Sequence, residues 1–108
     1  HNTNRIASLV GQNAARERMA ALLILTRPGT PLIDYGDEIG MPGSLGIGAS
    51  AEEYRRAPMD WTQSGKGTGV VTWLKEATQV NKPNDGVSVE EQQNVKGSLW
   101  SYYKMLIA

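Results

Sequence analysis

The chain has 108 residues, which suits one domain at most, and its 11 basic and 11 acidic residues give a formal net charge of zero. Because it has neither net positive charge nor a long basic run, nucleic acid is not an expected partner. The chain has no cysteine, which excludes disulfides and thiolate chemistry. The longest apolar run, residues 19–25, is far shorter than the roughly 20 residues of a membrane span, so no membrane association is expected.

Residues 12–26 predict the first helix, because they are rich in the strong helix formers Ala, Arg, Glu, Met and Leu. The second half of this segment is apolar nearly all round, which indicates burial on more than one side. Pro28-Gly29 ends the helix, and residues 31–35 (PLIDY) then predict a short strand. A helix, a turn and a strand in this order are typical of half a βαβ unit.

Residues 36–87 form a long irregular segment in which eight of the 12 glycines lie between Gly36 and Gly69. A loop of this length argues against an independent fold, because structureless loops beyond about 12–15 residues are uncommon in compact domains. Residues 88–108 predict a second helix. Ser88 and Glu91 form a capping box, and apolar residues then recur at helical spacing. Gly97 weakens the middle of this helix by about 1 kcal/mol relative to Ala.

Both ends of the chain look interrupted in this interpretation. The polar residues 1–5 have no strand before them, and residues 106–108 lie inside the apolar stripe of the second helix without a helix stop. We therefore expect the chain to be a piece of a larger protein.

Two stretches allow both a structural and a functional interpretation. Residues 1–5 (HNTNR) are as consistent with a solvated helix start, with Asn2 or Thr3 as the N-cap, as with a polar site. Residues 28–41 are either a turn, a strand and an acidic loop, or a strand end that delivers side chains to the carboxyl edge of a parallel sheet. In the second case the delivered side chains are Tyr35, Asp37 and Glu38.

Four motifs occur in order along the chain. They are HNTNR at residues 1–5, PGTP and YGDEIGM at 28–31 and 35–41, RAPMDW at 56–61, and VEEQ with LIA at 89–92 and 106–108. Together they resemble the catalytic barrel of glycoside hydrolase family 13, the α-amylase and α-glucosidase family. The first motif is similar to the family's Asn-His-Asp, beginning at its His.

The resemblance implies an α/β fold, namely the C-terminal portion, about the last quarter, of a (β/α)8 TIM barrel that is incomplete on its own. Residues 1–108 would be a fragment of one catalytic barrel domain. Its parts would be the strand 7 exit at 1–5, helix 7 at 12–26, strand 8 at 31–35, a long loop at 36–87 and helix 8 at 88–108. Active sites of such barrels lie at the carboxyl ends of the strands.

The resemblance also implies part of a retaining glycoside hydrolase acting on α-glucosidic bonds of starch-like oligosaccharides. Its partners would be an α-glucan or malto-oligosaccharide substrate and the remainder of the barrel, with no cofactor. The family's nucleophile and general acid come from the fourth and fifth strands, so this chain alone is expected to be inactive. Location is left open, with a bacterial secreted or periplasmic protein favoured.

The family's third carboxylate, the Asp of Asn-His-Asp, falls on Asn2. An amide can hydrogen-bond to sugar hydroxyls but supplies no negative charge beside a developing cation. Asn2 is thus an introduced change, a natural loss of the carboxylate or a sequence error. Whether the protein is an enzyme stays open. Asn2 favours the alternative of a non-catalytic barrel relative used for sugar binding or protein interaction.

The remaining site residues are also transferred from the resemblance. His1 would hydrogen-bond to a sugar hydroxyl, and Arg5 would contact substrate or anchor a neighbouring carboxylate. Tyr35 would shape the rim of the site, and Arg56 and Trp61 would lie on the long loop near the acceptor side. Stacking of Trp61 on a sugar ring and simple attachment of the loop to the barrel are equally acceptable. No metal site can be assigned from the sequence.

Overall fold

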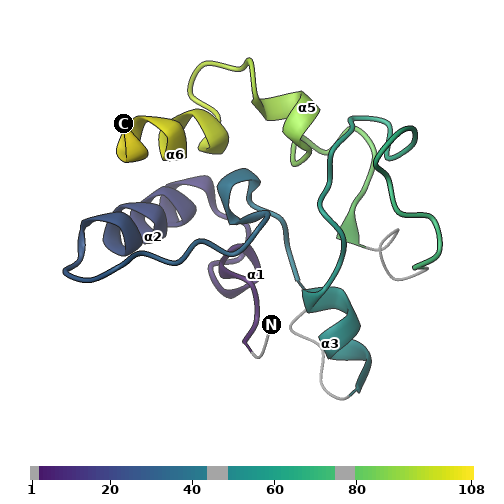
Figure 1. Cartoon of the computed structure of the whole chain (residues 1–108), viewed down its shortest axis with the longest axis horizontal. Coiled ribbons are helices and arrows are strands. Elements are labelled where there is room, and N and C mark those ends of the chain that lie inside the picture. The colour runs from purple at the N-terminus through teal and green to yellow at the C-terminus, as the bar shows by residue number, and fades with distance from the viewer. Residues whose placement is uncertain (1–2, 44–48, 75–79) are drawn as a thin grey trace.

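The computed structural model describes residues 3–43, 49–74 and 80–108, and short helices joined by extended links make up these ranges (Figure 1). The helices are α1 (Ile6–Leu9), α2 (Ala14–Thr26), the 3-10 helix η1 (Asp37–Ile39), α3 (Ala49–Arg55), α5 (Val89–Gln92) and α6 (Leu99–Ile107). None of the described helices has the length and apolar character needed to cross a bilayer.

The first predicted helix forms as α2, two residues shorter at its start than predicted. The side chain of Asn13 sets that start, because its Oδ1 accepts a hydrogen bond from the Arg16 backbone N–H at 3.1 Å. Upstream, α1 begins at Ile6 with Arg5 at its N-cap position, so the expectation that Asn2 or Thr3 caps a helix here is wrong.

The predicted strand at residues 31–35 is wrong for the described chain. Residues 31–34 are extended but form no strand ladder, and no described residue belongs to a β-strand. Leu32, at 87% exposed, has neither sheet neighbours nor a covering helix. The physical reason is that a strand requires a partner for its backbone groups, and the described residues place none beside this segment. The paired strands of the expected α/β barrel portion are therefore not seen here.

The predicted single helix at residues 88–108 is interrupted. Its first part is α5, whose capping box forms as predicted between Ser88 and Glu91. Residues 93–98 are not helical, and Gly97 has a φ of 83°, which a right-handed helix does not permit. A second N-cap follows, in which Ser98 Oγ accepts from the Ser101 N–H at 3.1 Å and starts α6. The long segment 36–87 also contains η1 and α3, which the sequence did not predict.

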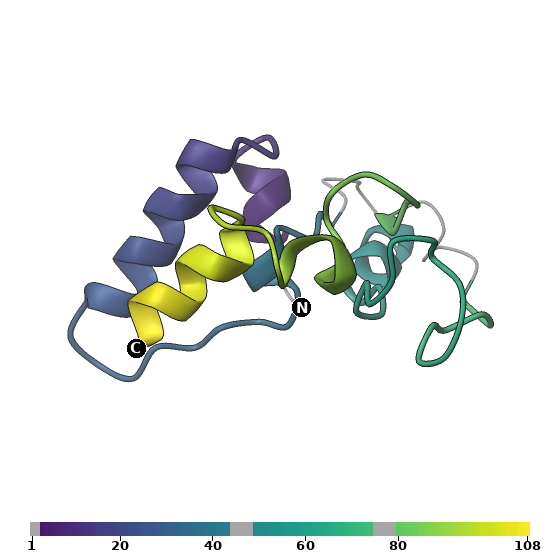
Figure 2. The same cartoon turned by 90° about the horizontal axis from the view of Figure 1, so that it is seen from above.

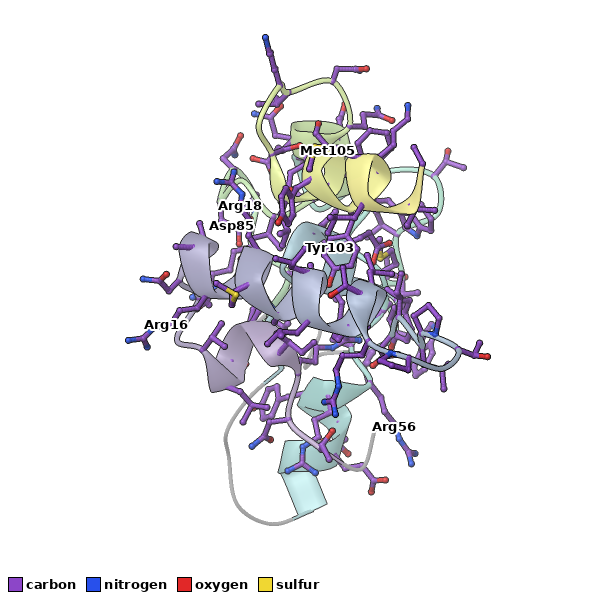
Figure 3. All side chains as sticks on the ribbon, turned by 90° about the vertical axis from the view of Figure 1, so that its left-hand side faces the viewer. Arg16, Arg18, Arg56, Asp85, Tyr103 and Met105 are labelled. Carbon is purple, nitrogen blue, oxygen red and sulfur yellow. The ribbon has the colours of Figure 1, made fainter. Side chains whose placement is uncertain are left out.

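Two apolar clusters hold these elements together. One lies between α2 and α6, which are side by side in both views (Figures 1 and 2), and contains the buried residues Ala21, Leu99 and Tyr103. Figure 3 shows Tyr103 directed from α6 toward α2. The other cluster joins η1 to later parts of the long segment 36–87 and contains Ile39, Met41, Ala57 and Val80.

Candidate functional site

The candidate site is built around Arg5, whose residue surface is only 4% exposed. The Arg5 Nη1 donates a hydrogen bond to the Tyr35 backbone carbonyl at 2.5 Å, and its Nε donates to the Arg55 carbonyl at 3.2 Å. The guanidinium also lies over the Tyr35 ring, 4.6 Å from the ring centroid. One side chain thus joins the start of α1, the segment before η1 and the end of α3.

Two further hydrogen bonds connect the same three segments. Asn4 Oδ1 accepts from Arg55 Nε at 3.0 Å, and the Tyr35 hydroxyl donates to the Ala57 carbonyl at 2.8 Å. The first bond closes the end of α3 back onto residue 4, 51 positions earlier, and the second connects Tyr35 to the residues just after α3. We call Asn4, Arg5, Tyr35 and Arg55 the Arg5 cluster.

Gly43 permits the close packing of this cluster. A Cβ at Gly43 would lie 2.9 Å from Arg5 Cγ and 3.3 Å from the Arg55 Cα, closer than ordinary van der Waals contact. The Gly43 backbone N–H donates to Ser8 Oγ at 2.8 Å, which fixes this segment against α1.

A pocket of about 290 Å³ lies beside the Arg5 cluster. Its lining includes Thr3, Asn4, Arg5, Asp34 and Asp37 together with the apolar residues Ile6, Ile24, Leu32 and Ile33. The Asp34 carboxylate is 3.8 Å from Arg5 Nη1. Burial raises the pKa of Asp37 to about 6, although the positive charge of Arg5 opposes the rise. Such a lining offers hydrogen-bond donors and acceptors of both charge types, which suits a hydroxyl-rich ligand.

The structure places the predicted site residues unequally. Arg5 and Tyr35 come together in the Arg5 cluster, whereas His1 and Asn2 lie outside the described residues. Arg56 is half exposed, forms an ion pair with Glu52 one helical turn earlier, and projects outward from the body in Figure 3. Trp61 is 49% exposed on the following loop and takes no part in the Arg5 cluster.

Sequence reasoning missed Asn4, Arg55 and Gly43 as members of the site. Asn4 and Arg55 are 51 positions apart, so no local spacing pattern connects them. Gly43 was one glycine among many in a loop, and only the approach of Arg5 distinguishes it. Among the residues that the structure describes, no group of three or more His, Asp or Glu side chains is arranged to hold a metal ion.

Comparison with known proteins finds a matching family model and several relatives of this chain. Residues 1–108 match the family model described as Alpha amylase, catalytic domain. The chain is 31% identical over 107 residues to Alpha-amylase 3 of Dictyoglomus thermophilum, covering 99% of this chain and 20% of that protein. It is 42% identical over 76 residues to Neopullulanase 2 of Thermoactinomyces vulgaris, covering 70% of this chain and 12% of that protein.

A third relative is Alpha-amylase SusG of Bacteroides thetaiotaomicron, which is 32% identical over 103 residues, covering 95% of this chain and 14% of that protein. The chain thus spans a fifth or less of the length of these three relatives. No solved structure matches the chain. Because the family match runs over all 108 residues, the chain belongs to the α-amylase catalytic-domain family, glycoside hydrolase family 13, whose architecture is a TIM barrel.

Proposed function

We propose that the chain is part of a retaining glycosidase that acts on α-glucosidic bonds of starch-like oligosaccharides. The observation that carries the proposal is the family match over the whole chain, which includes the motif at residues 1–5. The names of the relatives, two α-amylases and a neopullulanase, support an α-glucan as the substrate class.

In this proposal the chain supplies the last part of the barrel, and the remainder of the barrel is its structural partner. Retaining glycosidases use two carboxyl groups about 5–5.5 Å apart, one as nucleophile and one as general acid. By the resemblance, both come from barrel strands that precede this chain. The 108 residues alone therefore bind or position substrate but do not hydrolyse it.

Residues 1–5 carry the chain's own contribution to the chemistry. His1 would hydrogen-bond to a sugar hydroxyl, and the residue at position 2 would face the developing oxocarbenium ion. With Asn2 in that place, the site keeps a hydrogen-bonding group but lacks the negative charge that opposes the positive charge of the transition state. The proposed hydrolase is consequently slow unless that charge is restored.

The test is hydrolysis of maltoheptaose by the full-length protein that contains this chain, with Asn2 and with Asn2→Asp. We expect the α-anomer as first product by proton NMR, and kcat about 10²- to 10³-fold higher in the Asn2→Asp variant, the usual size of one electrostatic contribution. Asn94→Asp is the matched control, because Asn94 is exposed and lies beyond α5. Equal increases in both variants would contradict the role of position 2.

A second candidate is a non-catalytic barrel relative that binds sugar or protein, and the observation that favours it is Asn2 itself. The two candidates differ in the full-length sequence, where a hydrolase needs Asp and Glu at the nucleophile and general-acid positions. They also differ in the assay. Binding of maltoheptaose by calorimetry without hydrolysis by the Asn2→Asp protein would favour the non-catalytic relative.

A further inference from the structure

Arg5 is the charged side chain that the structure surrounds most completely at the candidate site. Its Nη1 and Nε donate to two backbone carbonyls from different segments, those of Tyr35 and Arg55. The Tyr35 ring covers one face of its guanidinium, and the stem of the side chain passes close to Gly43. Arg5 borders the neighbouring pocket, but at 4% exposure it offers a ligand little surface, and its Nη2, which has no hydrogen-bond partner in the described chain, is buried as well.

We propose that Arg5 is a positioning residue of the glycosidase site: it holds residues 3–5 against Tyr35 and the end of α3, and it acts on the reaction through that segment rather than by contact with the glucan. The inference rests on the proposed function and deepens it, because it assigns a way of acting to a residue for which the sequence left substrate contact and anchoring open.

The choice of arginine follows from the contacts. A guanidinium presents several N–H groups in a rigid planar fork, so it can donate in two directions while one face stacks on an aromatic ring. A lysine ammonium is a single point of charge on a flexible stem and cannot reproduce the two hydrogen bonds and the stacking together. The surroundings of Arg5 therefore select for shape as well as for charge.

The contacts restrain residues 3–5, the described part of the first motif. Arg5 is three residues after Asn2 in the sequence. It stands at the N-cap position of α1 and its side chain is buried, so both the helix and the packing hold it in place. Asn4 adds a second restraint through its bond to Arg55. Since misplacement of a reacting group by about 1 Å can cost 10²-fold in rate, loosening this segment is expected to reduce turnover.

Arg5 also restrains the two segments that it contacts, the one around Tyr35 and the end of α3. Tyr35 donates through its hydroxyl to Ala57, and Arg55 immediately precedes Arg56 of the loop motif. Loss of Arg5 should therefore loosen the segments at 35–43 and 52–57 together with residues 3–9. Contact with substrate alone would not connect these three segments.

The experiment uses the full-length protein carrying Asn2→Asp, with Arg5→Ala, Arg5→Lys and the exposed control Arg16→Ala, which projects outward from α2 in Figure 3. We expect Arg5→Ala to lower kcat for maltoheptaose by about tenfold or more, with KM changed less than about twofold, because transition-state alignment is lost rather than uniform binding. Arg5→Lys should not restore kcat. Added guanidinium ion should raise kcat of Arg5→Ala alone, by filling the space between the two carbonyls.

Hydrogen–deuterium exchange on the same proteins supplies a measurement independent of activity. Arg5→Ala should accelerate exchange in peptides covering 3–9, 35–43 and 52–57, and Arg16→Ala should leave all three unchanged. If Arg5→Ala fails to fold, Gly43→Ala tests the same cluster by pushing against Arg5 Cγ, with kcat falling and no response to guanidinium.

The outcomes separate the two proposals. A rise in KM with kcat unchanged, or a fall in kcat without faster exchange at 35–43 and 52–57, would overturn the positioning role. If neither the Asn2→Asp protein nor any of its Arg5 variants hydrolyses maltoheptaose, the proposed function fails. The exchange pattern then still decides whether Arg5 holds the three segments together.

Discussion

The side-chain amide nitrogen of Gln92 donates a hydrogen bond to the Ile39 carbonyl at 2.8 Å, across 53 positions of sequence. The same nitrogen donates to the Gly86 carbonyl at 2.8 Å, and the side-chain oxygen accepts from the Trp100 backbone N–H at 3.2 Å. Gln92 is 8% exposed, so a single buried side chain connects η1, the end of the long loop and the first turn of α6.

Replacing this side chain with an apolar one of similar length should be strongly destabilising. In Gln92→Met, the buried Ile39 carbonyl loses its partner, and so do the part-buried Gly86 carbonyl and Trp100 N–H. We expect the free energy of unfolding to fall by about 2 kcal/mol or more, since each unsatisfied buried group costs about 1–3 kcal/mol. The measurement is urea unfolding of the full-length protein with and without the substitution. The two free energies of unfolding are compared with the same dependence on urea concentration.

The matched control is Gln93→Met, because Gln93 is the next residue and its side chain is exposed. Its effect should stay within about 0.5 kcal/mol, as for most surface substitutions. Equal destabilisation by the two variants would show that the three hydrogen bonds of Gln92 contribute nothing specific.

Asp60 should make stability depend on pH. Burial, with smaller contributions from the charges of Asp85 and Glu91, raises the pKa of Asp60 to about 6 from its ordinary 3.8. Between these values the folded protein holds a proton that the unfolded chain has released. The contribution of Asp60 to stability is therefore full below about pH 4 and is lost as the pH rises through 6.

Asp60→Asn removes this dependence while keeping the size of the side chain. We expect the free energy of unfolding to fall less between pH 4 and pH 7 in Asp60→Asn than in the unchanged protein, measured by denaturant unfolding at several pH values. Glu53→Gln, at an exposed position of α3, should leave the pH profile as it is. Parallel profiles for Asp60→Asn and the unchanged protein would contradict the raised pKa.

Glycine at position 97 should contribute to stability through its backbone conformation and not through a lack of space for a side chain. Its φ is 83°, and a Cβ added there would meet no heavy atom within 4 Å. Gly97→Ala is expected to lower the free energy of unfolding by about 1 kcal/mol or more, because the left-handed region strains residues with a Cβ. Gly97→Asn should cost less than Gly97→Ala, since Asn tolerates this region better. Thermal unfolding of both variants gives the comparison, and the reverse order would exclude a backbone cause.

The parts of the fold that local chemistry controls were predictable from the sequence. The helix former content of residues 12–26 predicts α2, and the Ser88–Glu91 spacing predicts the capping box, because both involve neighbours within one helical turn. The sequence also marks Gly97 as a weak point in a helix, but the structure shows a full interruption there. Ser88 caps α5, Ser98 caps α6, and Gly97 between them has a left-handed backbone conformation. The segment predicted as one helix therefore forms two.

The parts that depend on distant partners were not predictable. The segment at 31–35 has strand composition, but a ladder also needs a neighbour, which the described chain does not place there. In the candidate site, motif matching identified Arg5 and Tyr35 but said nothing of how they contact each other. Asn4 and Arg55 meet only because the long loop returns to α1, and short-range patterns do not record such a return.

The extended run at residues 31–33 has a consequence for handling the protein. These residues form no backbone hydrogen bond with the rest of the described chain, and Leu32 adds an uncovered apolar side chain. Unpaired extended backbone is a template that another copy can extend edge to edge. Pro31 already removes one backbone N–H from this run, so a charged residue at Leu32 is the substitution that would further discourage edge-to-edge association of the isolated chain.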